Sequence, residues 1–216
     1  MNYIENVYIC LSAPLVIAIL GFKGKGRRLL LFLLCGMTVC LLSSYISTFF
    51  LAALKMDLVT GTIILTPMVE EIMKMFPLLF YLMVFEPGSE NSVGCVLMVA
   101  LGFATFENVC YMTQNGAASL LLLLIRGFGT GTMHVVCGAL LALGLTILWK
   151  QLYLRIAGMF GLLSLSVTYH GIYNLLVSQQ GAVAMVGYFV PIVSAFLIWI
   201  ITLRHAARLN PREETE

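Results

Sequence analysis

Residues 66–74 read Thr-Pro-Met-Val-Glu-Glu-Ile-Met-Lys, and they place Glu70, Glu71 and Lys74 inside an apolar run that extends from about Leu58 to Phe85. On membrane-insertion scales, each charged residue at the centre of a membrane helix costs about 2.5–3.5 kcal/mol. Charged residues at that depth mark functional sites by default. The stretch therefore predicts a site inside a membrane helix, with the other intramembrane polar groups as its partners.

Composition sets the class of protein. The chain has 216 residues, of which 61% are hydrophobic and 10% charged, whereas soluble domains are about 25% charged. Its apolar segments are each close to the ~20 residues that a helix needs to cross a bilayer. We therefore expect an all-α integral membrane protein, with residues 1–216 forming a single polytopic domain. The net charge of +2 gives no reason to expect nucleic-acid binding.

Seven segments are expected to cross the bilayer. They are 3–21, 29–54, 58–85, 92–113, 119–149, 154–178 and 183–203. The breaks between them contain the glycine, proline, asparagine or charged residues that are typical of turns. The first segment has an acidic start and is long enough to span, so it is interpreted as a membrane helix and not as a cleaved signal peptide.

The lysines and arginines predict the orientation. If the basic segment 23–28 is cytoplasmic, nine of the 12 basic residues fall on the cytoplasmic side, and only Lys55 falls outside. Lys74 and Arg126 lie within spans. Cytoplasmic loops are enriched in lysine and arginine, so we expect the N-terminus outside and the C-terminus in the cytoplasm.

The remaining intramembrane polar groups lie on the third to sixth spans. They are Glu107 on the fourth, Arg126 and His134 on the fifth, and His170 and Asn174 on the sixth. The outer spans contribute little. This distribution predicts a four-helix catalytic core over residues 58–178.

Local spacing suggests how the core is arranged. Glu70 and Lys74 are four residues apart, in the favourable order for an ion pair on one helix face. Pro67, one turn before the glutamates, is expected to distort the third span. The glycines at positions 127, 129 and 131 are expected to let neighbouring helices approach closely.

The residue types suit a zinc ion. Two imidazoles and a carboxylate, with a fourth position left for water, make up several catalytic zinc sites. Glu107, His134 and His170 are the candidate ligands. Glu70 or Glu71 is then the general base for hydrolysis of an amide within the membrane, and the choice between them is left open.

Supporting roles are assigned to four further residues. Lys74 is expected to pair with Glu70, Arg126 to neutralise a glutamate, and Asn108 to form a hydrogen bond between helices. Asn174 lies on the face of His170, four residues later. Chains of histidines and glutamates also mark proton relays in transporters, but the sequence has no inverted repeat of the kind such folds show.

At these residues the chain resembles the PrsW family of intramembrane proteases, which is related to the CAAX prenyl endopeptidases. The motifs that carry the resemblance are Glu70-Glu71-x-x-Lys74, Gly102-Phe103-Ala104-Thr105-x-Glu107-Asn108 followed by Tyr111, His134 after Arg126, and His170-Gly171-x-Tyr173-Asn174. The resemblance implies that Glu70 and Glu71 are the catalytic pair, that Glu107 is the acid of the second motif, and that His134 and His170 are the family histidines. It also implies that Asn174 stabilises an oxyanion or donates a hydrogen bond.

The resemblance further implies a biological role. It indicates a protease of the bacterial plasma membrane that makes the first, extracytoplasmic-side cut in a single-span anti-sigma factor, under envelope or antimicrobial-peptide stress. Two alternatives stay open within the same superfamily. One is a metal-free mechanism in which a glutamate and a histidine activate water directly, and the other is a non-catalytic membrane scaffold.

Overall fold

The computed structural model describes residues 3–85, 89–116, 119–148 and 152–209, and within them it is entirely helical. The long helices are α1 (Ile4–Gly21), α2 (Gly24–Ala53), α4 (Thr66–Phe85), α5 (Ser89–Asn115), α6 (Leu120–Leu148), α7 (Leu152–Val177) and α8 (Ala182–Leu209). Six of these are long and apolar enough to cross a membrane. The predicted class, an all-α polytopic membrane protein, is confirmed. The helix left out of the six is α4, because it carries Glu70, Glu71 and Lys74.

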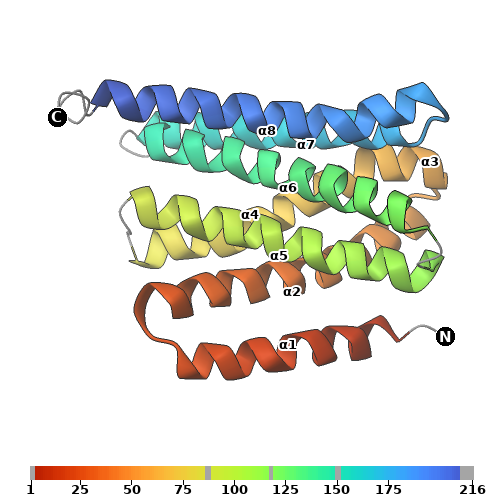
Figure 1. The fold of residues 1–216 in the computed structure, drawn as a ribbon, viewed down its shortest axis with the longest axis horizontal. Coiled ribbons are helices and arrows are strands. Elements are labelled where there is room, and N and C mark those ends of the chain that lie inside the picture. Colours follow the sequence, from red (N-terminus) through yellow and green to blue (C-terminus); the bar gives the residue numbers. More distant parts are fainter. Residues whose placement is uncertain (1–2, 86–88, 117–118, 149–151, 210–216) are drawn as a thin grey trace.

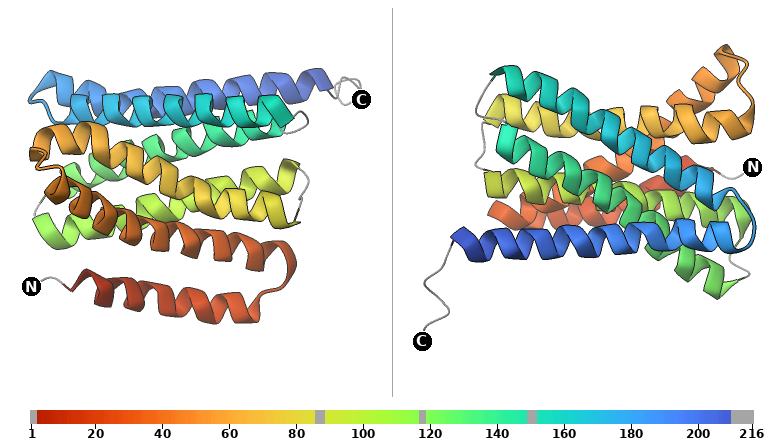
Figure 2. Two further views of the ribbon diagram at one scale, coloured as in Figure 1. Left: turned by 180° about the vertical axis from the view of Figure 1, so that it is seen from behind. Right: turned by 90° about the horizontal axis from the view of Figure 1, so that it is seen from above.

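The long helices lie side by side in one bundle, with α1 at one flank and α8 at the other (Figure 1). The start of α1 and the end of α8 are at opposite ends of the bundle, as expected when seven long helices alternate in direction (Figures 1 and 2). The helices α4 to α7 correspond to the predicted core. The predicted orientation relative to the cytoplasm stays a prediction.

The third predicted span is interrupted just before the two glutamates. A short helix, α3 (Leu58–Thr60), begins at Asp57, whose carboxylate accepts a hydrogen bond from the backbone N–H of Thr60 at 2.9 Å. It continues into a π-helical segment, η1 (Gly61–Leu65), which joins α4 directly. Since Pro67 has no backbone N–H to donate, the helix departs from α geometry here, and the expected distortion takes the form of this π turn. Short π segments are frequent at functional sites.

The π segment gives α7 a place to pack. At Gly171 an added Cβ would lie 2.8 Å from the backbone oxygen of Ile63. Asn174, on the same helix, donates a hydrogen bond from Nδ2 to the backbone oxygen of Thr62 at 3.0 Å. The helix that carries His170 is therefore held against the segment that leads into Glu70 and Glu71.

Two sequence-based expectations about glycines and loops need correction. The basic segment 23–28, expected as a break, is helical from Gly24 onward. The turn is confined to the extended residues Phe22 and Lys23 and to Gly24, which takes the left-handed backbone conformation (φ 59°). Of the glycines at 127, 129 and 131, only Gly129 packs closely, against Tyr188 of α8. Positions 127 and 131 face open space.

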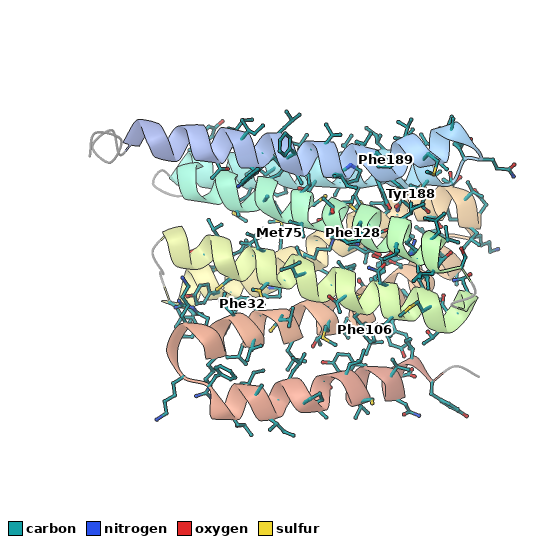
Figure 3. All side chains as sticks on the ribbon, viewed as in Figure 1. Phe32, Met75, Phe106, Phe128, Tyr188 and Phe189 are labelled. Atoms are coloured by element: carbon teal, nitrogen blue, oxygen red, sulfur yellow. The ribbon has the colours of Figure 1, made fainter. Side chains whose placement is uncertain are left out.

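The tightest helix contact is instead between α2 and α5. A Cβ added at Gly102 would lie 2.0 Å from the backbone oxygen of Leu33, and one added at Gly36 would lie 2.2 Å from that of Val99. Small residues allow such close backbone approach in membranes. One turn further along the same face of α5, Phe106 (labelled in Figure 3) is fully buried and packs against α2. Its ring also meets that of Tyr8 on α1 edge-on. The fifth helix is thereby fixed between α1, α2 and the core, with its polar residues turned toward α6.

This contact predicts a position-specific effect on stability. Gly102→Ala places a methyl group against the backbone of α2, which cannot move aside without separating the helices, so we expect the free energy of unfolding to fall by about 1–3 kcal/mol. The measurement is reversible unfolding of the purified protein in mixed micelles. Gly94→Ala is the matched control on the same helix, because its Cβ would meet only the end of Leu29, at 3.4 Å. Equal stability of the two variants would contradict the role of this contact.

Candidate metal centre

A buried ion pair on α4 forms the base of the site. Glu71 is 0% exposed and Lys74 is 6% exposed, and the Lys74 ammonium donates to Glu71 Oε1 at 2.7 Å. The expected pairing of Lys74 with Glu70 is therefore wrong. Residues three and four apart are both neighbours on a helix, and the tertiary fold decides between them, because the ammonium must also reach His134 on α6.

His134 is held through both of its ring nitrogens. The Lys74 ammonium lies 2.8 Å from His134 Nδ1, and His134 Nε2 lies 2.5 Å from Glu107 Oε2. Because an ammonium has only donors and a carboxylate only acceptors, Nδ1 accepts from Lys74 and the Nε2–H group donates to Glu107. The ring of Phe103 lies 4.9 Å from that of His134, centroid to centroid, and 4.2 Å from the Lys74 ammonium. These contacts set the orientation of the imidazole.

His170 is oriented by the other glutamate of the pair. Its Nδ1–H donates to Glu71 Oε1 at 2.8 Å, so its Nε2 carries a free lone pair. That Nε2 faces Glu70 Oε2 at 3.8 Å. A histidine that donates one ring N–H to a carboxylate while the other nitrogen stays available is the arrangement found around metal-binding histidines.

Glu70 supplies the third donor. Its Oε2 is buried and has no hydrogen-bond partner among the described residues. Among those residues, Glu70, His134 and His170 each offer one ligand atom, and these three atoms lie within 4.8 Å of one another. In a tetrahedral zinc site with bonds of about 2.0–2.2 Å, ligand atoms are roughly 3.3–3.6 Å apart. Because both ring nitrogens of His134 are engaged, His134 would have to exchange its hydrogen bond to Lys74 or to Glu107 for the metal. With that exchange, small side-chain movements would let the three donors hold one ion.

The charge of the cluster also fits a cation. With all groups ionised and both histidines neutral, it contains three carboxylates (Glu70, Glu71 and Glu107) and two cations (Lys74 and Arg126). One buried negative charge is therefore not balanced, and an unbalanced charge inside a membrane helix bundle is costly. A divalent ion at Glu70 offsets that charge and occupies the oxygen that has no partner.

The site is most open beside Glu107. The side chain of Glu107 is 27% exposed, against 16% for Arg126 and 0% for His134. Arg126 donates to Glu107 Oε1 at 3.1 Å, as expected of a residue that neutralises a glutamate, and its guanidinium lies 3.8 Å from the ring centroid of Tyr111. Glu107 is thus held from two sides, by His134 and by Arg126, and remains partly exposed.

The two asparagines have different positions. Asn174 lies one turn after His170 and is bonded to η1. Asn108 forms no hydrogen bond through its buried Oδ1, which has no partner among the described residues, and the residue lines a groove between α5 and α6. The hydrogen bond between helices that was expected of Asn108 is therefore not formed by this oxygen to any described residue.

Some neighbours of the site were not assigned roles from the sequence. Phe103 packs against both His134 and Lys74. Thr130 and Tyr173 share a hydrogen bond of 2.7 Å between their hydroxyl oxygens, and this bond joins α6 to α7. The helical spacing contained a signal for all three. Phe103 is four residues before Glu107, and Tyr173 is three after His170. Thr130 is likewise four residues before His134.

Comparison with known proteins agrees with this geometry. A family model described as PrsW family intramembrane metalloprotease matches residues 25–201, which include every residue of the cluster. No curated protein and no solved structure matches the chain. Because the match covers most of the 216 residues, the chain belongs to the PrsW family of intramembrane metalloproteases.

Proposed function

We propose that this protein is a zinc-dependent endopeptidase that cuts single-span membrane proteins, such as an anti-sigma factor in envelope or antimicrobial-peptide stress signalling, in the bacterial plasma membrane. The observation that carries the zinc assignment is the convergence of Glu70, His134 and His170, with the buried Glu70 Oε2 left without a partner. Membership of the metalloprotease family supports the reaction class.

Zinc, when bound, supplies a Lewis acid that polarises a carbonyl and acidifies a bound water molecule. The chain's own residues supply the rest. Glu71 keeps the Nε2 of His170 directed at Glu70 by accepting from its Nδ1–H, and Lys74 holds Glu71 in place. Partners of this kind, behind the ligands, typically change metal affinity 10- to 100-fold when they are removed.

The geometry favours an exchange of roles between two glutamates. The sequence placed Glu107 among the ligands and took the base from the Glu70–Glu71 pair. In the structure Glu70 lies with the two histidines, while Glu107 is at the open side and shares the His134 Nε2 proton. Glu107 is therefore the better-placed general base, because a base must reach the substrate and its water.

The position of the cluster supports a cut on the extracytoplasmic side. Glu107 and His170 are nearer to the ends of α5 and α7 than to their starts. The loops that follow these two helices are outside the cytoplasm if the basic segments are inside. The same placement puts the reacting groups within the bundle, where a soluble protein would not reach them but a membrane-spanning segment would.

Zinc dependence is tested by cleavage in liposomes. We expect the reconstituted protein to cut a co-reconstituted single-span anti-sigma factor, a membrane-permeant chelator to abolish the cut, and added zinc to restore it. Cleavage that persists after bound metal has been shown by elemental analysis to be gone would establish the metal-free alternative. Absence of cleavage of all such substrates by the zinc-loaded protein would favour the non-catalytic scaffold.

The proposed exchange of roles has a readout that does not depend on activity. Glu70→Gln removes a ligand, so we expect zinc affinity to fall by at least a hundredfold and cleavage to be lost. Glu107→Gln removes the base and a partner of His134 but no ligand, so we expect cleavage to be lost while zinc affinity falls by no more than about 10- to 100-fold. Both are measured by elemental analysis and competition with a zinc dye. A large loss of zinc affinity in Glu107→Gln and a small one in Glu70→Gln would show instead that Glu107 is the ligand.

The ion pair of Lys74 with Glu71 predicts an effect on stability that can be separated from the effect on activity. Lys74→Met leaves the Glu71 carboxylate buried beside no cation, so we expect the free energy of unfolding to fall by about 3–5 kcal/mol. Adding Glu71→Gln removes the unpaired charge and should recover much of that loss without recovering activity, because His170 then lacks its carboxylate partner. Unfolding in mixed micelles measures both. A single variant as stable as the wild type would show that the pair is not structural.

A further inference from the structure

A long groove runs beside the metal centre, on the outer face of α5 and α6. Its first part is lined by residues that include Ala104, Asn108, Gly127 and Gly131, and has a volume of about 300 Å³. A second hollow, of about 330 Å³, lies between the other halves of α5 and α6 and is closed on one side by α8. Val135 lines both, so the two hollows adjoin along α5 and α6, and together they are called the groove here.

The groove has the length of a membrane-spanning segment. On α5 its lining runs from Val93 to Asn108, and on α6 it runs from Ala142 back to Gly127. At 1.5 Å per residue each stretch is about 22 Å long, which is most of the ~30 Å hydrocarbon thickness of a bilayer. Figure 1 shows α5 and α6 crossing the bundle next to each other, with α8 beside α6. An occupant that lies along this groove therefore spans the membrane with the protein.

One end of the groove adjoins the metal centre. Asn108 follows Glu107 in the chain and Gly127 follows Arg126, while Gly131 is three residues before His134. The pair Glu107 and His134 bridges α5 and α6. Glycines 127 and 131 leave open space above this junction, because a Cβ added at either would meet no atom within 4 Å. The side chains of Glu107 and His134 do not themselves line the groove, but a chain lying in its glycine-lined half is next to the junction that they form.

The polar character of this end indicates a peptide and not a lipid tail. The exposed lining is almost wholly apolar in the half beside α8, and polar groups from Thr105, Asn108 and Thr132 gather in the half near Glu107. Asn108 Oδ1 is buried beneath this lining and has no hydrogen-bond partner among the described residues, so the side chain would have to turn toward the groove to meet an occupant. A carbonyl oxygen of this kind accepts a backbone N–H group, which an unwound peptide offers and a lipid acyl chain does not.

We infer that this groove, bounded by α5, α6 and α8, is the docking site for the substrate's transmembrane helix, and that Asn108 receives a backbone N–H of the segment to be cut. The identification of the occupant as a substrate helix rests on the proposed protease function. The apolar half holds the intact helix. The glycine-lined half, where no side chains intervene, accepts the segment that leaves the helical conformation beside Glu107.

The test uses photocrosslinking in liposomes, with a synthetic peptide that has one alanine–leucine span of about 20 residues as the probe. Benzoylphenylalanine replaces Thr105, an exposed groove residue, or Phe160, which is 70% exposed on α7 and does not line the groove. We expect a saturable peptide adduct from position 105 and not from position 160. Adducts that do not saturate, equal adducts from the two positions, or adducts to phospholipid alone at position 105 would overturn the inference.

Two glycine variants complete the design. Gly131→Leu fills the groove, so we expect the adduct from position 105 to fall at least fivefold. Gly161→Leu is the matched control, since it adds the same side chain at another position with open space around it, on α7. An unchanged adduct in Gly131→Leu would contradict the docking site. A peptide that crosslinks but is never cut counts against the protease function alone, and a peptide that is cut equally well by Gly131→Leu counts against the groove alone.

Discussion

The structure of the site depends on one buried ammonium group. Lys74 lies between Glu71 on its own helix and His134 on α6, and it is almost completely excluded from solvent. A lysine at this depth is tolerated only with partners. Because its two partners belong to different helices, the group joins α4 to α6, and through Glu71 it also determines how His170 of α7 is held. Three of the four core helices are thus tied together at one nitrogen atom.

From this point the polar contacts continue outward in a single connected chain. His134 is hydrogen-bonded to Glu107 on α5, and Glu107 is hydrogen-bonded to Arg126. The guanidinium of Arg126 in turn lies over the ring of Tyr111. Side-chain exposure is 4% at Lys74 and 0% at His134, and it is higher at Glu107 (27%) and Arg126 (16%). The inner part of this network is therefore dry, as suits groups that hold a metal ion. The outer part is accessible, as suits a group that exchanges protons with water.

The same arrangement explains the two irregular features of the fold. The π segment η1 shapes the entry to α4 and receives Gly171 and Asn174 of α7, so it sets the distance between the glutamate pair and His170. On α6, Gly129 and Gly138 allow close packing against neighbouring helices, whereas Gly127 and Gly131 do not. The latter two keep the junction of α5 and α6 uncovered beside Glu107. Close packing and open access are thus supplied by different glycines.

The sequence alone determined the fold class of this protein and most of the residues of its site. The apolar run lengths require membrane helices, and the cost of intramembrane charge singles out the residues of the cluster, because both follow from solvation of single residues. The pairing of Lys74 with Glu71 and not Glu70, the approach of Glu70 to the two histidines, and the open space at Gly127 and Gly131 were decided by the tertiary structure. They depend on how helices are rotated and placed against one another. Spacing along one helix leaves that rotation free, since positions three and four residues away are neighbours alike.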